Sequence, residues 1–523
     1  MTDDLHLGSY HANGPWSLAD REPTWRASVP GLRRDLAAEL PRLLTPRKVP
    51  PLRRGVTVVG HLGRAVAGWR LRDHGTSGSR AGLARRFREA AEALGPTYIK
   101  LAQIISAGEG VFPAELVAEC RRCRDQVPAE PFEVVRSILE ADLGRPLHEV
   151  FRQIDPQPVA AASIAQVHGA VLRSGEEVVV KVQRPSIDRL VRQDLEVLTW
   201  LAPHLVGRIP VAALANPPAL VELFAETIVE ELDFRLEADN MMELARVFAV
   251  LDQRDFVIPR PHPELVTRRV LVMERLDGFR FDDVAGMTDA GVDTHAVIRT
   301  GMIGFLEGAM LHGIFHGDLH GGNLFVLPDG RTALVDFGIT ARLTEGERLA
   351  FLRMMMSATT NDVRGQVAAL RDLGALPPDT DLDAVIEDLG LAGPPLDPTT
   401  LTPDQLVAEL QRVIKALLAY GARLPKSLML YIKNLIFIDG AIGTLAPDLD
   451  LFGEVTHIAT HFAVTHGPTI AAELGVAAQW DLDLEGLKAG FGVDPSVTNQ
   501  LIYRELRERR ALIQRRLGSR RLG

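Results

Sequence analysis

The 523-residue chain contains little cysteine, few aromatic residues and no long hydrophobic run. Its two cysteines are too few for a disulfide framework and suit a reducing compartment. Aromatic residues make up only 6% of the chain and no nucleic-acid-binding module is recognisable, so we expect no nucleic-acid partner. No uninterrupted apolar stretch approaches the ~20 residues that span a bilayer, and the acidic start at Asp3 and Asp4 is unlike a secretory signal. The sequence therefore predicts a cytoplasmic or peripheral membrane protein without a transmembrane span or signal peptide.

The composition is that of a globular protein with basic ends. Hydrophobic residues make up 46% of the chain and charged residues 24%, which excludes fibrous and disordered classes. The net charge is −10, but both ends are basic. There are 17 Lys and Arg against 6 Asp and Glu between Arg21 and Lys100, and 8 against 2 between Arg504 and Gly523. Basic ends around an acidic centre favour contact with an anionic membrane surface. A solvated arginine-rich helix is the alternative interpretation of the C-terminal tail.

The region from His316 to Asn323, read together with Asp336–Gly338, has the spacing of a phosphoryl-transfer site. Asp318 is followed by an asparagine five residues later and by a second carboxylate, Asp336, eighteen residues later. Asp318 is the candidate catalytic residue, because an aspartate there can orient and deprotonate an attacking hydroxyl. Asn323 and Asp336 are the candidate metal ligands, since Mg²⁺ prefers hard oxygen donors. The spacing predicts a nucleotide bound through a divalent metal.

The residues between these two metal ligands are predicted to form a β-hairpin. Apolar runs at 324–327 and 332–335 flank the turn sequence Pro-Asp-Gly-Arg at 328–331. A tight hairpin would bring Asn323 and Asp336 together.

The sequence offers two other candidate metal sites, neither of which is favoured. His316 and His320 have the spacing of a helical zinc pair, but Gly317 stands where the metalloprotease motif requires glutamate. Cys120 and Cys123 form a lone Cys-x-x-Cys in a helical, arginine-rich context with no second pair. We interpret both cysteines as ordinary helix positions rather than as a metal or redox site.

A nucleotide-binding half is expected upstream of the catalytic loop. The β-branched run at 177–182 contains Lys181, a cation that can neutralise the α- and β-phosphates of a nucleotide. The glycine-rich loop expected before such a strand is missing, and an alanine-rich segment stands in its place at 160–168. Its small residues would let backbone amides approach phosphate in a stiffer loop than glycine provides. The candidate phosphate contacts are Ala160, Ala161, Ala162 and Ser163.

The alanine-rich segment is one of several features by which the chain resembles the UbiB-like (ADCK-type) atypical kinase family. The segment Tyr98–Gln103 is similar to that family's Lys-x-Gly-Gln signature, and Glu231–Ala238 is similar to its Glu-x-Asp motif followed by a helical glutamate. Met273–Gly278 looks like its hinge, and the resemblance covers roughly residues 90 to 345. One departure is Ala102, which stands where the family has glycine and adds a methyl group to a closely packed helix.

The resemblance implies an α+β, two-lobed protein-kinase-like fold that is mostly helical, with an N-terminal helical extension over the active site. It implies that Lys181 pairs with Glu237, that Glu274 and Leu276 contact the nucleotide at the hinge, and that ATP or ADP binds with Mg²⁺. It also implies a regulatory group in which the helix carrying Lys100 and Gln103 lies over the active site, with Lys100 meeting Glu231 and Asp233. Lys100 and Gln103 are three residues apart, so one helix face can carry both.

No long activation segment follows Asp336–Gly338. Helix begins within ten residues, with Thr344 as a predicted N-cap three residues before Glu347, and there is no Ala-Pro-Glu motif. A platform for a protein substrate is therefore not expected.

The chain divides into five predicted segments. The first 50 residues lack sustained periodicity and read as a mobile extension. The five segments are a basic N-terminal extension (1–79), a helical extension (80–154), a nucleotide-binding lobe with a helical insertion (155–275), a helical lobe interrupted at 376–404 (276–470) and a basic helical tail (471–523).

The resulting hypothesis is an ATP-dependent, Mg²⁺-requiring atypical kinase or ATPase. The family resemblance implies a role in isoprenoid-quinone or other lipid metabolism, with a hydrophobic lipid or quinone precursor as partner. One alternative is a small-molecule phosphotransferase similar to the antibiotic phosphotransferases. Another is a nucleotide-gated scaffold without useful catalysis. The sequence indicates neither the phosphoryl acceptor nor the oligomeric state.

Overall fold

The computed structural model divides the chain into two compact units. The first holds the described residues up to Gly278 together with Ala333–Thr340, and the second holds Phe279–Thr332 and the described residues from Ala341 onward. The sequence predicted this lobe boundary three residues earlier, at 275. The structure describes residues 22–46, 52–73, 79–106, 113–123, 128–205, 217–391, 412–413, 416–417, 419–422, 425–475, 483–485, 488 and 502–519.

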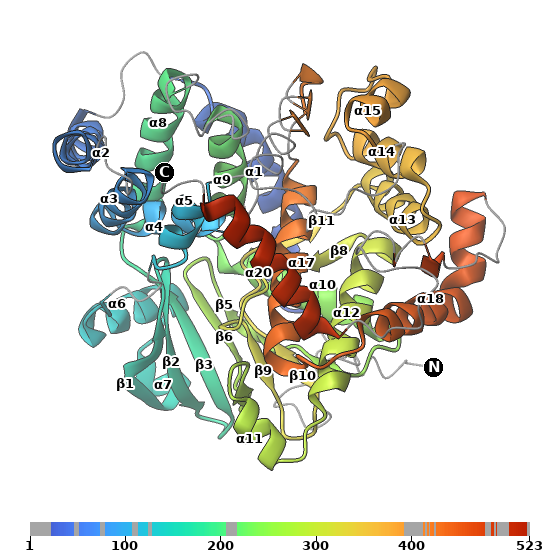
Figure 1. Cartoon of the computed structure of the whole chain (residues 1–523). Helices are drawn as coiled ribbons and strands as arrows, with labels where there is room; N and C mark the ends of the chain where they lie inside the picture. Colours follow the sequence, from blue (N-terminus) through green and yellow to red (C-terminus); the bar gives the residue numbers. More distant parts are fainter. Residues whose placement is uncertain are drawn as a thin grey trace. The chain divides into compact units, whose positions relative to one another are not determined.

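A five-stranded antiparallel sheet forms the centre of the first unit (Figure 1). Its strands, in spatial order, are β1 (Phe151–Ala161), β2 (Ala165–Leu172), β3 (Glu177–Gln183), β6 (Val270–Glu274) and β5 (Pro261–Val266). Valines at alternate positions of β3, Val178, Val180 and Val182, pack in one buried cluster with Leu139. Period-two burial of β-branched residues is what a half-buried strand requires. The sheet begins at Phe151, four residues before the predicted lobe boundary at 155.

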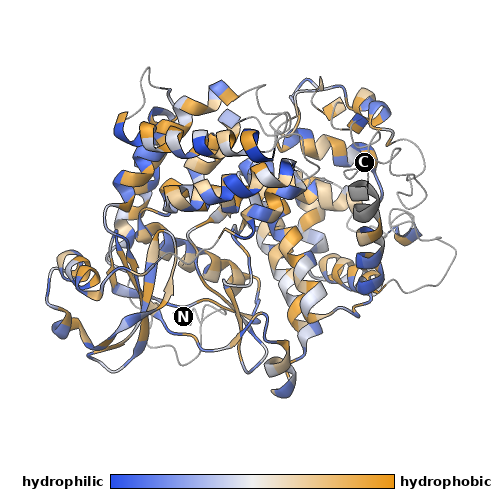
Figure 2. Ribbon diagram, turned by 60° about the vertical axis from the view of Figure 1, so that its left-hand side comes forward, coloured by the Kyte–Doolittle hydropathy of each residue, from blue (hydrophilic) through white to orange (hydrophobic). Residues whose placement is uncertain are grey.

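Helices precede the sheet, and the described part of the segment between Lys181 and Glu237 is mainly helical, as predicted. Those before the sheet are η1 (Arg26–Ser28), α1 (Val29–Leu43), α2 (Leu52–Arg72), α3 (Ser79–Leu94), α4 (Pro96–Ser106), α5 (Ala114–Cys120), α6 (Phe132–Leu143) and α7 (Leu147–Val150). Those in the insertion are α8 (Ile187–Leu205), α9 (Pro217–Glu230) and α10 (Phe234–Val250), followed by the short strand β4 (Phe256–Val257). Many helices carry both hydrophobic and hydrophilic residues along their length (Figure 2), which is the pattern of half-buried helices.

Helix α1 corrects the prediction of a mobile extension over the first 50 residues. Trp25, just before η1, is buried. Arg26 Nε and Arg33 Nη2 donate to the two carboxylate oxygens of Asp239 on α10, at 2.9 and 2.8 Å. The prediction was wrong here because these partners lie more than 200 residues away, so no local pattern reveals them.

We expect Asp239→Asn to weaken the contact of η1 and α1 with α10 and to make the loss of stability depend on pH. Burial raises the pKa of Asp239, but the bonds from Arg33 and Arg26 outweigh it and hold the pKa below its usual 3.8. A depressed carboxyl pKa stabilises the fold above the unfolded-state pKa, and this stability is lost as pH falls through the folded-state pKa. In urea denaturation, the free energy of unfolding of the variant should be about 1–2 kcal/mol lower than that of the wild type at pH 7. This difference should shrink in acid. Asp252→Asn, at an exposed aspartate, is the control, and a pH-independent difference would contradict this account.

The second unit is mainly helical. Its strands are β7 (Phe279–Arg280), which pairs antiparallel with β9 (Leu324–Val326), and β8 (Ile314–His316), while β10 (Thr332–Leu334) and β11 (Thr340–Arg342) lie at the unit boundary. Its helices are α11 (Val284–Asp289), α12 (Thr294–Leu311), α13 (Glu345–Thr359), α14 (Val363–Asp372), α15 (Leu382–Asp388), α17 (Lys426–Leu445), α18 (Leu451–Leu474) and α20 (Tyr503–Ser519). The predicted capping box of Thr344 and Glu347 is confirmed at the start of α13.

An aromatic cluster forms part of the core of the second unit. Phe305 on α12, Phe315 on β8 and Phe351 on α13 all pack around Tyr431 on α17, with ring centroids 4.6–6.1 Å from the tyrosine ring. Phe315 immediately precedes the loop that carries Asp318, so this cluster sets where that loop leaves the core.

Among the described residues, α17 is the one helix that is long and apolar enough to cross a membrane by length and composition. The same helix carries Tyr431 of the aromatic cluster, and a core helix has this composition too. The predicted basic tail is helical where it is described. It is anchored at its start, because Tyr503 of α20 is buried and its amide donates to Leu449 O at 3.0 Å.

Candidate functional site

Lys181 lies at the centre of a buried ion-pair network in the first unit. It sits in the middle of β3, opposite Val167 on one side and Leu271 on the other. Its Nζ donates to Glu237 Oε1 and Oε2 at 2.8 and 3.0 Å and to Asp336 Oδ1 at 3.1 Å. The structure therefore brings three of the predicted site residues together, from a strand, a helix and a loop.

Burial and the charge of its ion-pair partners shift the pKa of Lys181 in opposite directions, and the same holds for Glu237 and its partner Lys181. Burial lowers the pKa of Lys181, but the neighbouring carboxylates of Asp336 and Glu237 outweigh it, so the net shift is upward and the ammonium is retained. Burial raises the pKa of Glu237 to about 7, and the nearby charge of Asp336 adds to that shift while Lys181 opposes it. A carboxylate with only 3% of its side chain exposed depends on its cationic partner.

The loop that carries Asp336 is held in an uncommon backbone conformation. Asp336 has φ of +62°, a region that aspartate and asparagine tolerate better than most residues. The amide of Gly338 donates to Asp336 Oδ1 at 3.3 Å, and Asn240 Nδ2 on α10 donates to Phe337 O at 2.8 Å. About half of the Asp336 side chain, 47%, is exposed, so solvent or an ion can reach it.

The predicted alanine loop is mostly strand. Ala160 and Ala161 are the last residues of β1 and pair with Val167 and Gln166, and strand resumes at Ala165. The turn itself is only Ala162, Ser163 and Ile164, closed by a bond from the Ala162 amide to Ala165 O at 2.8 Å. Arg184 Nε donates to Ala162 O at 2.9 Å, and Ser163 is buried. The loop prediction was wrong because the small residues continue the strand pairing up to a three-residue turn.

The two predicted hinge residues differ in exposure. Glu274 ends β6 with its side chain buried, and its Oε2 accepts a bond from the Arg260 amide at 3.2 Å. Burial raises the pKa of Glu274, although the Arg260 amide opposes the shift. Leu276 is half-buried in the connection that follows.

The predicted regulatory residues are brought together in part. Lys100 Nζ on α4 lies 3.0 Å from Glu231 Oε1, and both side chains are largely buried. Asp233 caps α10 and is paired with Arg235 Nη2 at 2.7 Å, and its predicted contact with Lys100 stays a prediction. Gln103 lies on the same short helix as Lys100.

Helix α4 connects to the Asp336 loop through Glu231. A Cβ added at Gly338 would lie 3.2 Å from Glu231 Cγ, so glycine allows the close approach of this side chain. Ala102, which replaces the family's glycine, has no exposed surface. Its methyl group is therefore accommodated inside the packing of α4 rather than projecting into solvent.

In the second unit, α17 holds the loop around Asp318. Lys433 Nζ bonds to Asp318 Oδ1, Asn434 Nδ2 bonds to His316 O, and Asn434 Oδ1 accepts from the Leu319 amide at 3.3 Å. Asn323 Nδ2 donates to Asp318 O at 3.0 Å, which fixes the two predicted site residues of this loop relative to each other. Asn323 belongs to the second unit and Asp336 to the first, so their pairing as ligands of one metal stays a prediction.

Sequence reasoning missed Lys433 and Asn434. They lie more than 100 residues after Asp318, and the available signal was a pair of polar residues in the middle of an otherwise apolar segment. The predicted turn after Asn323 is confirmed, because the Leu327 amide donates to Arg331 O at 2.8 Å and the Gly330 amide donates to Leu327 O at 2.9 Å.

The structure shows the local setting of the two alternative metal pairs. His316 ends β8 and His320 lies in the following loop, and the Nδ1 of each accepts a backbone amide two residues later, so no helical zinc pair forms. Cys120 and Cys123 are buried and form no disulfide, and Cys120 ends α5 whereas Cys123 lies in the turn after it, so the predicted helix position is confirmed for Cys120 only. Burial raises the pKa of Cys120 to about 12, which keeps it a thiol and not a reactive thiolate.

Comparison with known proteins identifies the family. A model of the ABC1 atypical kinase-like domain matches residues 122–370. The chain is 36% identical over 360 residues to an uncharacterized protein of Mycobacterium tuberculosis, covering 68% of this chain and 73% of the relative. It is 32% identical over 372 residues to a probable protein kinase UbiB of Marinobacter nauticus, covering 70% and 68%. A solved structure of a Mycobacterium tuberculosis protein with erythromycin aligns with a TM-score of 0.40 and 22% identity, over 66% of this chain and 90% of that one.

The α+β, two-lobed kinase-like fold predicted from the sequence is confirmed. The chain belongs to the UbiB-type (ADCK-type) family of ABC1 atypical kinase-like proteins.

Proposed function

We propose that this protein binds ATP or ADP with Mg²⁺ and acts as an atypical kinase or ATPase. The observation that carries the proposal is the buried Lys181 ammonium, held at 2.8 Å by Glu237 and at 3.1 Å by Asp336. A cation fixed in this way is preorganised to receive phosphate oxygens, because little rearrangement is needed on binding. Glu237 acts as a positioning residue for Lys181 and does not itself contact the nucleotide.

The donor chemistry around Asp336 fits Mg²⁺. Its carboxylate supplies the hard oxygen that this ion prefers, on a side chain that is 47% exposed. When bound, Mg²⁺ would neutralise phosphate charge. Asn323 remains the predicted second ligand.

In the second unit, Asp318 is the proposed group that orients an attacking hydroxyl or water and accepts its proton. Lys433 holds the Asp318 carboxylate, and the side chains of both are largely buried. We assign Lys433 a positioning role for the Asp318 carboxylate. Asn434 supports the same loop through its bonds to the backbone of His316 and Leu319.

The proposed acceptor or cargo is a hydrophobic lipid or an isoprenoid-quinone precursor. Helix α13 begins at Glu345, only seven residues after Gly338, which leaves no long segment to build a peptide platform. The UbiB-named relatives place the chain in a family linked to ubiquinone biosynthesis, which supports a quinone-linked role. A soluble phosphorylated metabolite would instead favour the small-molecule phosphotransferase.

The basic helix α2 is the proposed contact with an anionic membrane surface. Five of the eleven exposed large hydrophobic residues found among the described residues lie on this one helix. Four of them recur at helical spacing and form a stripe, and exposed arginines accompany it. The stripe is Leu52, Val56, Val59 and Val66, and the arginines are Arg53, Arg64, Arg70 and Arg72. An apolar stripe beside arginines is the composition of an interfacial helix.

One experiment tests both the catalytic proposal and the membrane surface. We expect purified protein to hydrolyse ATP only with Mg²⁺ and to turn over faster with anionic vesicles. Val56→Ser should leave basal turnover unchanged and weaken vesicle binding about fivefold, because it removes apolar area from the stripe. The matched control is Val250→Ser, since both valines are 73% exposed.

The outcomes separate the hypotheses. If Mg²⁺·ADP binds but purified protein shows no turnover in a single-turnover assay, the nucleotide-gated scaffold replaces the enzyme. If turnover is present but Val56→Ser and Val250→Ser bind vesicles equally, the membrane surface lies elsewhere and the catalytic proposal stands.

A further inference from the structure

We infer that Glu307, His461 and His466 form a binding site for a transition-metal dication, with Zn²⁺ as the best fit. Glu307 lies on α12, and both histidines lie on α18, within the second unit. The site is separate from Asp318 and does not rest on the proposed nucleotide chemistry.

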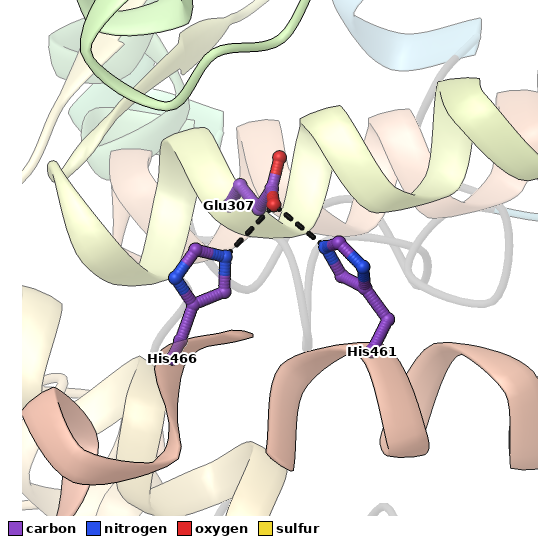
Figure 3. Close-up of side chains that lie close together, drawn as sticks. All are labelled: Glu307, His461 and His466. Carbon is purple, nitrogen blue, oxygen red and sulfur yellow. Dashed lines mark hydrogen bonds and ion pairs between the residues drawn. The ribbon is translucent and has the colours of Figure 1, made fainter. Parts of the chain in front are cut away.

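The geometry converges on one carboxylate oxygen. Nε2 of His461 and Nε2 of His466 each lie 2.9 Å from Oε1 of Glu307. The three ligand atoms lie within 4.8 Å of one another. Figure 3 shows both imidazoles pointing from their helix toward this carboxylate. Ligands of a tetrahedral zinc ion are about 3.3 Å apart, so each imidazole nitrogen would move about 0.4 Å away from the carboxylate oxygen to admit an ion.

The donor set selects the class of metal. Two imidazoles and one carboxylate form a known catalytic zinc ligand set, and imidazole favours transition metals over Mg²⁺ and Ca²⁺. Three protein ligands leave a fourth position for water. The partly exposed side chains of His461, at 31%, and His466, at 13%, provide a way in from solvent.

Burial of the carboxylate supports a cationic occupant. Only 3% of the Glu307 side chain is exposed, and a buried carboxylate requires a compensating positive charge.

The sequence does not reveal this cluster. Positions five residues apart diverge by about 140° on an ideal helix, so His461 and His466 do not form a recognisable helical pair. Pro468 lies two residues after His466 and removes one backbone hydrogen bond of α18, which relaxes the helix where the second imidazole must turn. Glu307 is more than 150 residues upstream.

The test is metal titration of the full chain after chelator treatment, in excess Mg²⁺ so that oxygen-only sites are filled. We expect one equivalent of Zn²⁺ to bind in competition with a chromophoric chelator. Co²⁺ should give a spectrum without the thiolate charge-transfer band that Cys120 and Cys123 would produce. Glu307→Gln and His466→Ala should weaken binding about 100-fold or more, since loss of an outer-shell partner alone costs about 10–100-fold.

The matched control is His457→Ala, because His457 is exposed on the same helix one turn before His461. It should bind Zn²⁺ like the wild type. His461→Ala, at the most exposed of the three ligands, repeats the test if the buried variants fail to fold. Absence of Zn²⁺ binding by the wild type, or equal binding by the ligand variants and His457→Ala, would overturn the site and leave a hydrogen-bonded triad only.

Discussion

Asp336→Asn should lower Mg²⁺-dependent ATP turnover by about 100-fold or more. The substitution removes the negative charge from the proposed metal ligand, and a loss of about 2.7 kcal/mol in transition-state stabilisation corresponds to a factor of 100. Asparagine tolerates the positive φ of Asp336 and keeps an oxygen that can accept from Lys181 and Gly338, so the loop should retain its shape. Single-turnover hydrolysis with radiolabelled ATP measures the effect.

The control for this variant is Asp329→Asn, which changes an exposed aspartate in the nearby turn. Asp329 is ion-paired to Arg331 at the surface, where such pairs contribute little to stability. Its turnover should match the wild type. Unchanged turnover in Asp336→Asn would rule out a metal-ligand role for Asp336, whatever the control shows.

Lys181→Met should reduce both nucleotide binding and stability. The variant leaves Glu237 buried without its cation, and breaking one half of a buried pair costs about 3–5 kcal/mol. We expect the melting temperature to fall by about 5–10 °C. Mg²⁺·ADP should raise the melting temperature of the wild type and have no effect on that of the variant.

The double variant Lys181→Met/Glu237→Met separates structure from chemistry. Replacing both partners of a buried pair with apolar residues is often neutral or stabilising, so the melting temperature should return close to that of the wild type. Nucleotide binding should remain absent, because the phosphate-binding cation is still missing. If the double variant is as unstable as Lys181→Met, the loss does not come from the unpaired charge of Glu237.

The importance of Lys181 and Asp336 can be predicted from the sequence because both residues lie in local sequence patterns. Lys181 lies in a β-branched run, and Asp336 and Asp318 are set by short fixed spacings. The pairing of Lys181 with Glu237 came instead from the family resemblance, and the structure places those atoms 2.8 Å apart. The helical insertion and the capping box at Thr344 were also foreseeable, since helix periodicity and capping depend on neighbours within a few residues.

The alanine segment shows where local reasoning fails. The absence of glycine was visible in the sequence and suggested a stiff loop, but small residues pair in a strand as readily as they line a loop. Pairing of Ala160 with Val167 decided the outcome, and this register depends on the whole sheet. Helix α1 was missed for a similar reason, because its anchor at Asp239 is distant along the chain.

By itself the sequence determined the chemical identity of the candidate site. The residue types and short spacings around Asp318, Asp336 and Lys181 predict phosphoryl-transfer chemistry, since phosphate and metal binding require particular charges at particular positions along one loop or strand. Only the tertiary structure decided which distant groups hold these residues. The contacts of Lys433 with Asp318 and of two imidazoles with Glu307 join segments that are remote in sequence. Such contacts follow from packing, which no local pattern encodes.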